Sequence, residues 1–275
     1  MLKKFIKYQS LGNHFIIFDW RTYTESSVST TIAKSTWPEM VIQLCTPAFG
    51  IGADGVLLIT TAPEPDSFVM RIFNADGSQA ENCLNGLRCV AHFLLTQNPQ
   101  TPSVRIFIGN RVSICSQDAT TKDIITSVGK ATFEKTITLN CAGRSFTGHS
   151  TNIGNPHFLI EEQISHKDLL VYGPLLESHP EFPNKTNVEF FWLKNNTSPH
   201  FYINMLPFER GAGPTLACSS GVAVLLDFLL STKRIQHNTP TTCSMPGGST
   251  IGWVNEQGVI FLQAAAHHIF NGILP

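Results

Sequence analysis

Charged residues are scarce in this chain of 275 residues. They make up 14% of the sequence, and the 19 Lys and Arg nearly balance the 20 Asp and Glu. Without a basic run, the electrostatic pattern of a nucleic-acid-binding protein is missing. The sequence also lacks an uncharged apolar stretch of about 18 residues, the length that a membrane span needs. We therefore expect no nucleic-acid partner and no membrane, and we expect a cytoplasmic location because polar residues interrupt any apolar signal core.

The seven cysteines indicate neither a disulfide framework nor a metal site. Their number is odd, their spacing is irregular, and the chain is long enough to form a core without cross-links. Zinc ligands usually come in close pairs such as Cys-x2-Cys. The nearest pair here, Cys83 and Cys89, has five residues between its members. We expect no bound metal.

Short β-type runs, separated by clusters of Gly, Pro, Asn and Asp, make up most of the chain. Two longer apolar stretches with helical spacing, residues 85–95 and 220–230, predict buried helices. The expected fold class is therefore α/β (α+β) and rich in strands. Strands are expected at residues 15–18, 56–60, 68–73, 104–108, 158–160, 188–193, 201–206 and 259–263.

The two helical stretches belong to an internal repeat. The segment that starts at Cys83, CLNGLRCVAHFLL, resembles the one that starts at Cys218, CSSGVAVLLDFLL, and LGNHFII resembles IGNPHFLI. Matches in the same order predict two related halves of roughly 130 residues that pair about a pseudo-twofold axis. We place the N-terminal half at residues 1–120 and the C-terminal half at residues 121–262.

Cys83 and Cys218 occupy matching positions in this repeat, each just before an apolar helix. A helix N-terminus favours an anion, because its first N–H groups and the helix dipole point toward it. A thiol there is expected to have a lowered pKa. The same N–H groups can hold a substrate carboxylate.

If the two halves face each other, a carboxylate held between the helix ends would have one sulfur on each face of the neighbouring carbon. One thiolate could remove the α-proton while the opposite thiol protonates the other face, which inverts an amino-acid stereocentre. Oriented dipoles stabilise the developing charge, so no cofactor is needed. The remaining cysteines are expected to be structural: Cys45, Cys89, Cys115, Cys141 and Cys243.

Other polar residues cluster in the repeated loops. Asn is common in turns, so each asparagine has a structural as well as a functional interpretation. Arg210, beside Glu209 in a Gly-rich turn, offers a bidentate site for a second carboxylate. His157 could tune a thiol or cap a turn. The full candidate set is Asn13, Asn74, Asn155, His157, Asn187, Glu209 and Arg210.

Six motifs, in order along nearly the whole chain, resemble the signatures of the diaminopimelate epimerase family. They are FGIGADG (49–55), NADGSQAENCLNGLRC (74–89), GNPH (154–157), GPLLESHPEFP (173–183), FERGAGPTLACSSG (208–221) and MPGGS (245–249). The resemblance implies two similar domains, each a mixed β-barrel-like sheet around a central helix, with a last strand at 263–275 returning to the first domain. It also implies cofactor-independent interconversion of LL- and meso-2,6-diaminopimelate, in lysine and peptidoglycan-precursor biosynthesis.

The resemblance also implies roles for single residues. Cys83 and Cys218 correspond to the two acid/base thiols, with His157 and Glu209 close to them. Family members are often homodimers, and Phe270 stands at the position of an aromatic interface residue. The substrate-binding positions would be Asn13, Asn74, Leu84, Asn85, Asn155, Asn187, Glu209, Arg210, Ser219 and Ser220, of which Leu84, Asn85, Ser219 and Ser220 form the α-carboxylate cradle.

Four departures from the family pattern leave other readings open. Leu84 and Ser219 stand where the family usually has Gly. Pro214 stands where it has Glu, and His14 stands where it has Asp. One alternative is a two-cysteine racemase for another amino acid, such as histidine. A second is a phenazine-pathway isomerase, which does not use the cysteine pair. The third is a binding protein that has lost turnover.

Overall fold

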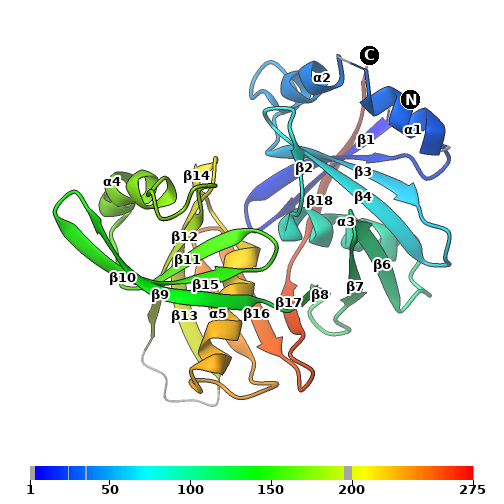
Figure 1. Ribbon diagram of the computed structural model, residues 1–275. Helices are drawn as coiled ribbons and strands as arrows, with labels where there is room; N and C mark the ends of the chain where they lie inside the picture. Colours follow the sequence, from blue (N-terminus) through cyan, green and yellow to red (C-terminus); the bar gives the residue numbers. More distant parts are fainter. Residues whose placement is uncertain (1–3, 24, 35, 195–199, 275) are drawn as a thin grey trace. The chain divides into compact units, whose positions relative to one another are not determined.

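The computed structural model describes residues 4–23, 25–34, 36–194 and 200–274. The chain forms two compact units (Figure 1). Unit 1 comprises Met1–Thr126 together with Ala264–Pro275, and unit 2 comprises Ser127–Gln263. Strands predominate and helices are interspersed, so the expected α/β class is confirmed. Within the described part of the chain, no helix is long and apolar enough to cross a membrane.

Unit 1 is built around one central helix. The C-terminal strand β18 pairs with β1, so the end of the chain is part of this unit. From β1 the sheet continues through antiparallel β2, parallel β3, antiparallel β4, parallel β6 and antiparallel β7. The elements are β1 (Lys4–Ser10), β2 (Asn13–Asp19), α1 (Glu25–Ile32), α2 (Thr36–Cys45), β3 (Gly55–Thr61), β4 (Ser67–Asn74), β5 (Gln79–Ala80), α3 (Leu84–Gln97), β6 (Ser103–Ile108), β7 (Arg111–Gln117), β8 (Ile124–Gly129, which runs past the boundary) and β18 (His267–Ile273).

Unit 2 repeats this order of pairings. Strand β10 pairs with antiparallel β11, and the sheet continues through parallel β12, antiparallel β13, parallel β15 and antiparallel β16. The repeat read from the sequence is therefore a repeat of topology. The elements are β9 (Thr132–Cys141), β10 (Arg144–Asn152), β11 (Pro156–Glu161), α4 (His166–Glu177), β12 (Asn187–Leu193), β13 (Phe201–Glu209), β14 (Gly213–Pro214), α5 (Ser219–Ser231), β15 (Thr241–Met245), β16 (Gly248–Val254) and β17 (Ile260–Ala264).

The helices α3 and α5 are the central helices of the two units (Figure 1). Both are apolar around nearly their whole circumference, which suits a helix surrounded by strands. The helix α3 contacts β1, β2, β6 and β7, and α5 contacts β11 and β16. The two helices expected at residues 85–95 and 220–230 are thus confirmed, each about one residue longer at its N-terminal end.

Three further helices were not expected from the sequence. The helix α1 is rich in Ser and Thr, which are weak helix formers. The helix α4 contains Gly173 and Pro174, which locally disfavour a helix. Tertiary packing explains Gly173, because a Cβ atom there would lie 2.3 Å from the ring of Phe208. Local propensity was outweighed by the burial of this helix face.

A glycine on the last strand tests the closure of unit 1. Gly272 pairs with Phe5 across β18 and β1, and an added Cβ atom would lie 2.1 Å from the buried Phe5 ring. We expect Gly272→Ala to lower the free energy of unfolding by about 1–3 kcal/mol, as overpacking does. Urea unfolding measures this change. Val112→Ala on β7, at a side chain that is 51% exposed, is the control and should change stability by less than about 0.5 kcal/mol; equal effects would contradict the close approach.

Candidate active site

Cys83 is the N-cap residue of α3. Its backbone is extended, and its Sγ accepts a hydrogen bond from the N–H of Gly86 at 3.3 Å. The thiol is half-buried. A cap of this kind satisfies one of the first N–H groups of the helix and places the sulfur at the positive end of the helix dipole. The expected helix-start position of Cys83 is confirmed.

Beneath this helix end lies an apolar side chain. A Cβ atom on Gly86 would stand 3.1 Å from a methyl group of Leu57 on β3 and 3.4 Å from the Cys83 sulfur. One turn further along α3, the fully buried Arg88 donates hydrogen bonds to Ser10 Oγ (2.7 Å) and Asn85 Oδ1 (3.1 Å). Burial lowers the pKa of Arg88, and electrostatic interactions with the Cys89, Cys83 and Cys115 thiols oppose that shift. A guanidinium group is still charged in this setting, so unit 1 holds a buried cation close to Cys83.

The other candidates of unit 1 make hydrogen bonds that support the backbone. Asn13 donates to the Asp54 carboxylate at 2.9 Å. Asn74 is exposed and donates to Ser78 Oγ at 3.0 Å, in the turn between β4 and β5. Both hydrogen bonds fit the structural interpretation of these asparagines and leave a binding role as a proposal.

Cys218 is the N-cap residue of α5, as Cys83 is of α3. Its Sγ accepts from the N–H of Gly221 at 3.3 Å and lies 3.4 Å from Ser220 Oγ. The expected helix-start position is again confirmed. The side chain differs from that of Cys83 in being buried, with 1% of its surface exposed. The two matching positions therefore differ in solvation.

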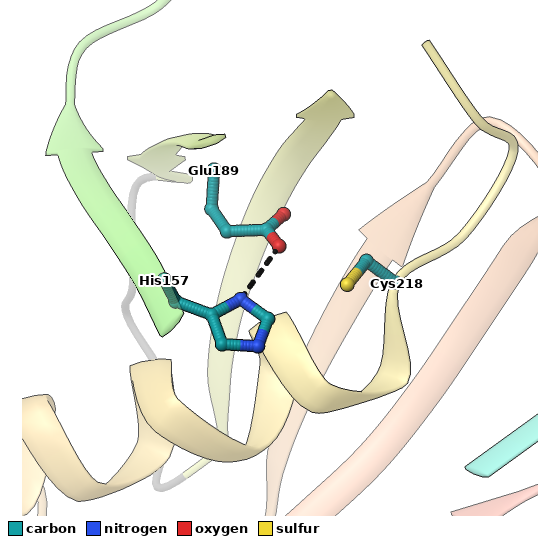
Figure 2. Close-up of side chains that lie close together, drawn as sticks. All are labelled: His157, Glu189 and Cys218. Atoms are coloured by element: carbon teal, nitrogen blue, oxygen red, sulfur yellow. Dashed lines mark hydrogen bonds and ion pairs between the residues drawn. The ribbon is translucent and has the colours of Figure 1, made fainter. Parts of the chain in front are cut away.

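A buried acid and a buried imidazole lie next to Cys218. His157 on β11 and Glu189 on β12 are both fully buried, with Nδ1 and Oε1 3.1 Å apart (Figure 2). One ligand-type atom from each of these residues and the Cys218 sulfur all lie within 4.8 Å of one another. The cluster has donor atoms that Zn²⁺ accepts, but the imidazole Nδ1 is already paired with the carboxyl group.

This environment corrects the expectation of a lowered thiol pKa at Cys218. Burial raises the pKa of the Cys218 thiol well above its usual value, and the carboxyl groups of Glu189 and Glu209 raise it further. The effect of desolvation outweighs that of the helix dipole because the sulfur is almost completely removed from water. The expected location of His157 near the thiol is shown, but Glu189 was missed. Its only sequence signal is one acid within the apolar run NVEFFWL.

Burial shifts the pKa values of both His157 and Glu189. Burial lowers the pKa of His157 to about 3, with a contribution from the positive charge of Arg210. Burial raises the pKa of Glu189, against a hydrogen bond from the Cys218 thiol, while Glu209 adds to the rise. Near neutral pH the imidazole is therefore neutral, and the Glu189 carboxyl group is a weaker acid than an exposed glutamate. Burial of an unpaired charge is costly.

The remaining candidates of unit 2 surround the same helix end. Asn187 donates to the carbonyl of Pro156 at 2.8 Å and accepts from the N–H of Arg210 at 3.0 Å, so it fixes the backbone that carries Arg210. Asn155 reaches Ser220 Oγ at 3.5 Å.

The side chains at the end of β13 have different surroundings. Glu209 Oε1 accepts from Thr215 Oγ1 at 2.5 Å. The side chain of Arg210 is exposed and contacts the carbonyl of Asn184 at 3.4 Å. The structure thus brings Cys218 and His157 together at one end of the sheet of unit 2. The loops that carry Asn155, Asn187 and Arg210 lie at the same end.

Phe270 lies on β18 in unit 1. Its ring meets that of Phe5 edge to face with centroids 6.0 Å apart, and 43% of the side chain is exposed. Ile269 and Ile273 on the same strand are exposed as well. This strand therefore carries several apolar side chains that face solvent in the single chain.

Comparison with known proteins decides the family. The model of the family described as diaminopimelate epimerase matches residues 5–134 and 149–269. The chain belongs to the diaminopimelate epimerase family. A relative named diaminopimelate epimerase from Synechococcus sp. (strain JA-2-3B'a(2-13)) is 34% identical over 290 residues, which cover 98% of this chain and 96% of the relative. Another of that name from Acaryochloris marina is 33% identical, with 99% of both chains covered.

Solved structures support the fold of this diaminopimelate epimerase family member. A hydroxyproline epimerase from Agrobacterium vitis matches with a TM-score of 0.71 and 10% identity, covering 99% of this chain and 92% of that one. A phenazine biosynthesis protein of the PhzF family from Bacillus anthracis matches with a TM-score of 0.70 and 12% identity, covering 99% of both. At these identities the likeness concerns the fold alone.

The two helix-start glycines provide a matched test of the two sites. A Cβ atom on Gly221 would lie 2.4 Å from the Glu189 carboxyl group, whereas one on Gly86 would meet methyl groups of Leu57 at 3.1 and 3.2 Å. We expect Gly221→Ala to lower the free energy of unfolding by about 1–3 kcal/mol. Gly86→Ala should cost less than about 1 kcal/mol, since better helix propensity offsets a milder contact. Urea unfolding of both variants checks this, and a reversed order would rule out the close fit of Glu189 under α5.

Proposed function

We propose that the protein is a diaminopimelate epimerase, an isomerase that interconverts LL- and meso-2,6-diaminopimelate without pyridoxal phosphate or another cofactor. The observation that carries this proposal is the repeated helix start: two cysteines, each the N-cap of a buried helix, in the segments whose sequence resembles the family's cysteine motifs. The names of the relatives support this substrate over histidine, and both cysteines are retained, unlike in a phenazine-type isomerase.

In the proposed reaction the two thiols work as an acid and a base. The thiolate of one cysteine takes the α-proton of the substrate, and the thiol of the other gives its proton to the opposite face of the same carbon. The charge that develops at the α-carbon spreads into the carboxylate. Helix N-termini stabilise such an anion through their dipoles and N–H groups. We assign the cradle for this carboxylate to the first turns of α3 and α5, at Leu84, Asn85, Ser219 and Ser220.

The distal amino-acid group of the substrate has suitable partners in unit 2. The guanidinium of Arg210 can bind a carboxylate through two parallel hydrogen bonds. Its backbone is anchored by Asn187, and Glu209 and Asn155 lie on the adjoining loops. We assign these residues, together with Asn13 and Asn74 of unit 1, to substrate binding.

The cellular setting follows from the proposed reaction. We propose a cytoplasmic enzyme of lysine and peptidoglycan-precursor biosynthesis that acts on a small-molecule substrate. We also propose a homodimer in which the exposed apolar residues of β18, Phe270 among them, lie at the interface. Burial on dimer formation would remove these side chains from water.

The two-thiol mechanism predicts that each cysteine is indispensable. Cys83→Ala or Cys218→Ala should lower epimerisation by at least about 10²–10⁴-fold, the range for loss of a positioned acid or base. The measurement is incubation with LL-diaminopimelate in deuterium oxide under reducing conditions, with stereochemistry and α-deuterium followed together. Cys141→Ala, at a buried thiol on β9, is the control and should remain active. Near-normal turnover in either test variant would exclude the two-base mechanism.

The assignment of Arg210 predicts a strict substrate range. Lysine lacks the distal carboxylate, so it leaves the polar partners of that group unpaired, which discriminates strongly. We expect LL-diaminopimelate to be inverted and lysine, histidine and glutamate to be inverted negligibly, as chiral chromatography of the products would show. Arg210→Lys should lose most activity, because a point charge does not replace the bidentate fork. Efficient turnover of a single-centre amino acid would favour the racemase alternative instead.

A further inference from the structure

The two units differ in the side chains that lie under their central helices. In unit 1, Phe15 on β2 pairs with Gly55 on β3; in unit 2, His157 on β11 pairs with Asn187 on β12. These are matching pairs of matching parallel strands. His157 therefore stands where unit 1 has Phe15.

Two positions further along the matching strands β3 and β12 lie Leu57 and Glu189, which therefore also correspond. Gly86 lies three residues after Cys83 and faces Leu57, and Gly221 lies three residues after Cys218 and faces Glu189. The apolar side chain beneath the helix end in unit 1 is thus replaced by an acidic side chain in unit 2. Buried charged groups are rare without a partner, so this replacement needs an explanation that packing alone does not supply.

Glu189 is held in place on several sides. Its Oε1 lies 3.1 Å from Nδ1 of His157, and a carboxyl oxygen lies within 4.8 Å of the Cys218 sulfur (Figure 2). Gly221 packs so closely against that carboxyl group that any side chain larger than hydrogen at this position would collide with it. No partner of Glu189 Oε2 is found among the described residues. Packing against Gly221 and the hydrogen bond with His157 therefore hold the carboxyl group on the side of the cluster where Cys218 lies.

The two cysteines also differ in the ionisable groups around them. Arg88 of α3 lies near Cys83, and the residue at the matching place in α5, five after Cys218, is Ala223. Glu209 at the end of β13 interacts with both Glu189 and Cys218, and Cys243 on β15 interacts with Glu189. His157 on β11 pairs with Glu189, and Arg210 acts on His157. A cation favours a thiolate, whereas a carboxylate disfavours one.

We propose that Glu189 is a positioning residue of the catalytic machinery, which acts from its place beside Cys218 to keep that sulfur in the thiol form. This inference rests on the proposed function, in which one sulfur must be a thiolate and the other a thiol at the start of each turnover. When the α-proton moves to one sulfur, the S–H proton of the other moves to carbon, so protons balance. A carboxyl group beside Cys218 makes that side the proton donor of the resting enzyme.

The test is a pH titration of both thiols by NMR in protein labelled with ¹³C at the cysteine Cβ, without substrate. Cys83→Ser and Cys218→Ser spectra assign the two signals. Glu189→Gln keeps the shape of the neutral carboxyl group but never becomes an anion. We expect it to move the Cys218 midpoint down by at least about one pH unit, a tenfold change in proton affinity, and to leave the Cys83 midpoint in place.

Two further variants complete the design. Glu161→Gln removes a carboxylate from β11 of the same unit, where it pairs with Arg234 at the surface, and should leave both midpoints and turnover unchanged. Glu189→Leu copies Leu57 of unit 1 and carries the same expectation as Glu189→Gln, so the test stands if the amide variant does not fold. A Cys218 titration curve that coincides with that of the wild type would overturn the proposal, including the case in which neither protein titrates.

Steady-state kinetics separate this inference from the function on which it rests. If the wild type epimerises diaminopimelate, Glu189→Gln should lower kcat at least tenfold with little change in KM, because the proposed role concerns the thiol and not substrate binding. A wild type that does not epimerise diaminopimelate but shows the expected Cys218 shift would refute the proposed function and leave the Glu189 contact standing. An active wild type without that shift would refute the role of Glu189 alone.

Discussion

The structure depends on the close approach of a helix end to a strand, which occurs once in each unit. In each unit a cysteine caps the central helix and the glycine three residues later brings that helix against the third strand. A larger residue at the glycine would push the helix away and move the sulfur with it. The position of each thiol is thus fixed by backbone packing, which is stiffer than any surface loop. Chemistry that requires two sulfurs at one carbon needs this stiffness, because small displacements are costly in catalysis.

The repeat has diverged in the side chains that surround its two cysteines. Unit 1 combines a half-buried sulfur, an apolar floor and a buried cation, whereas unit 2 combines a buried sulfur with a carboxyl group and a neutral imidazole. Two copies of one scaffold therefore place their cysteines in different surroundings.

The fold and the cysteines could be read from the sequence because their signals are local. Apolar periodicity marks α3 and α5, and the repeated Cys-x-x-Gly marks where they begin. The helix α4 was missed because Gly173 and Pro174 disfavour a helix locally, and its stability comes from packing against Phe208. Glu189 and the raised pKa of Cys218 were missed for a related reason. Desolvation depends on what surrounds a group in three dimensions, and strand register alone reveals that Glu189 lies beside His157.

The pairing of β18 with β1 joins two segments that lie far apart in the sequence. Unit 2 is one continuous segment, whereas unit 1 is completed only by residues that follow unit 2 in the chain. On a ribosome, which exposes the chain from its N-terminus, unit 2 is the first to have all its strands. The earlier part of unit 1 must wait, with an unpaired edge on β1, until β18 has been synthesised. Long-range pairing of this kind slows folding. It also means that the Cys83 thiol is held in place only if β18 is intact.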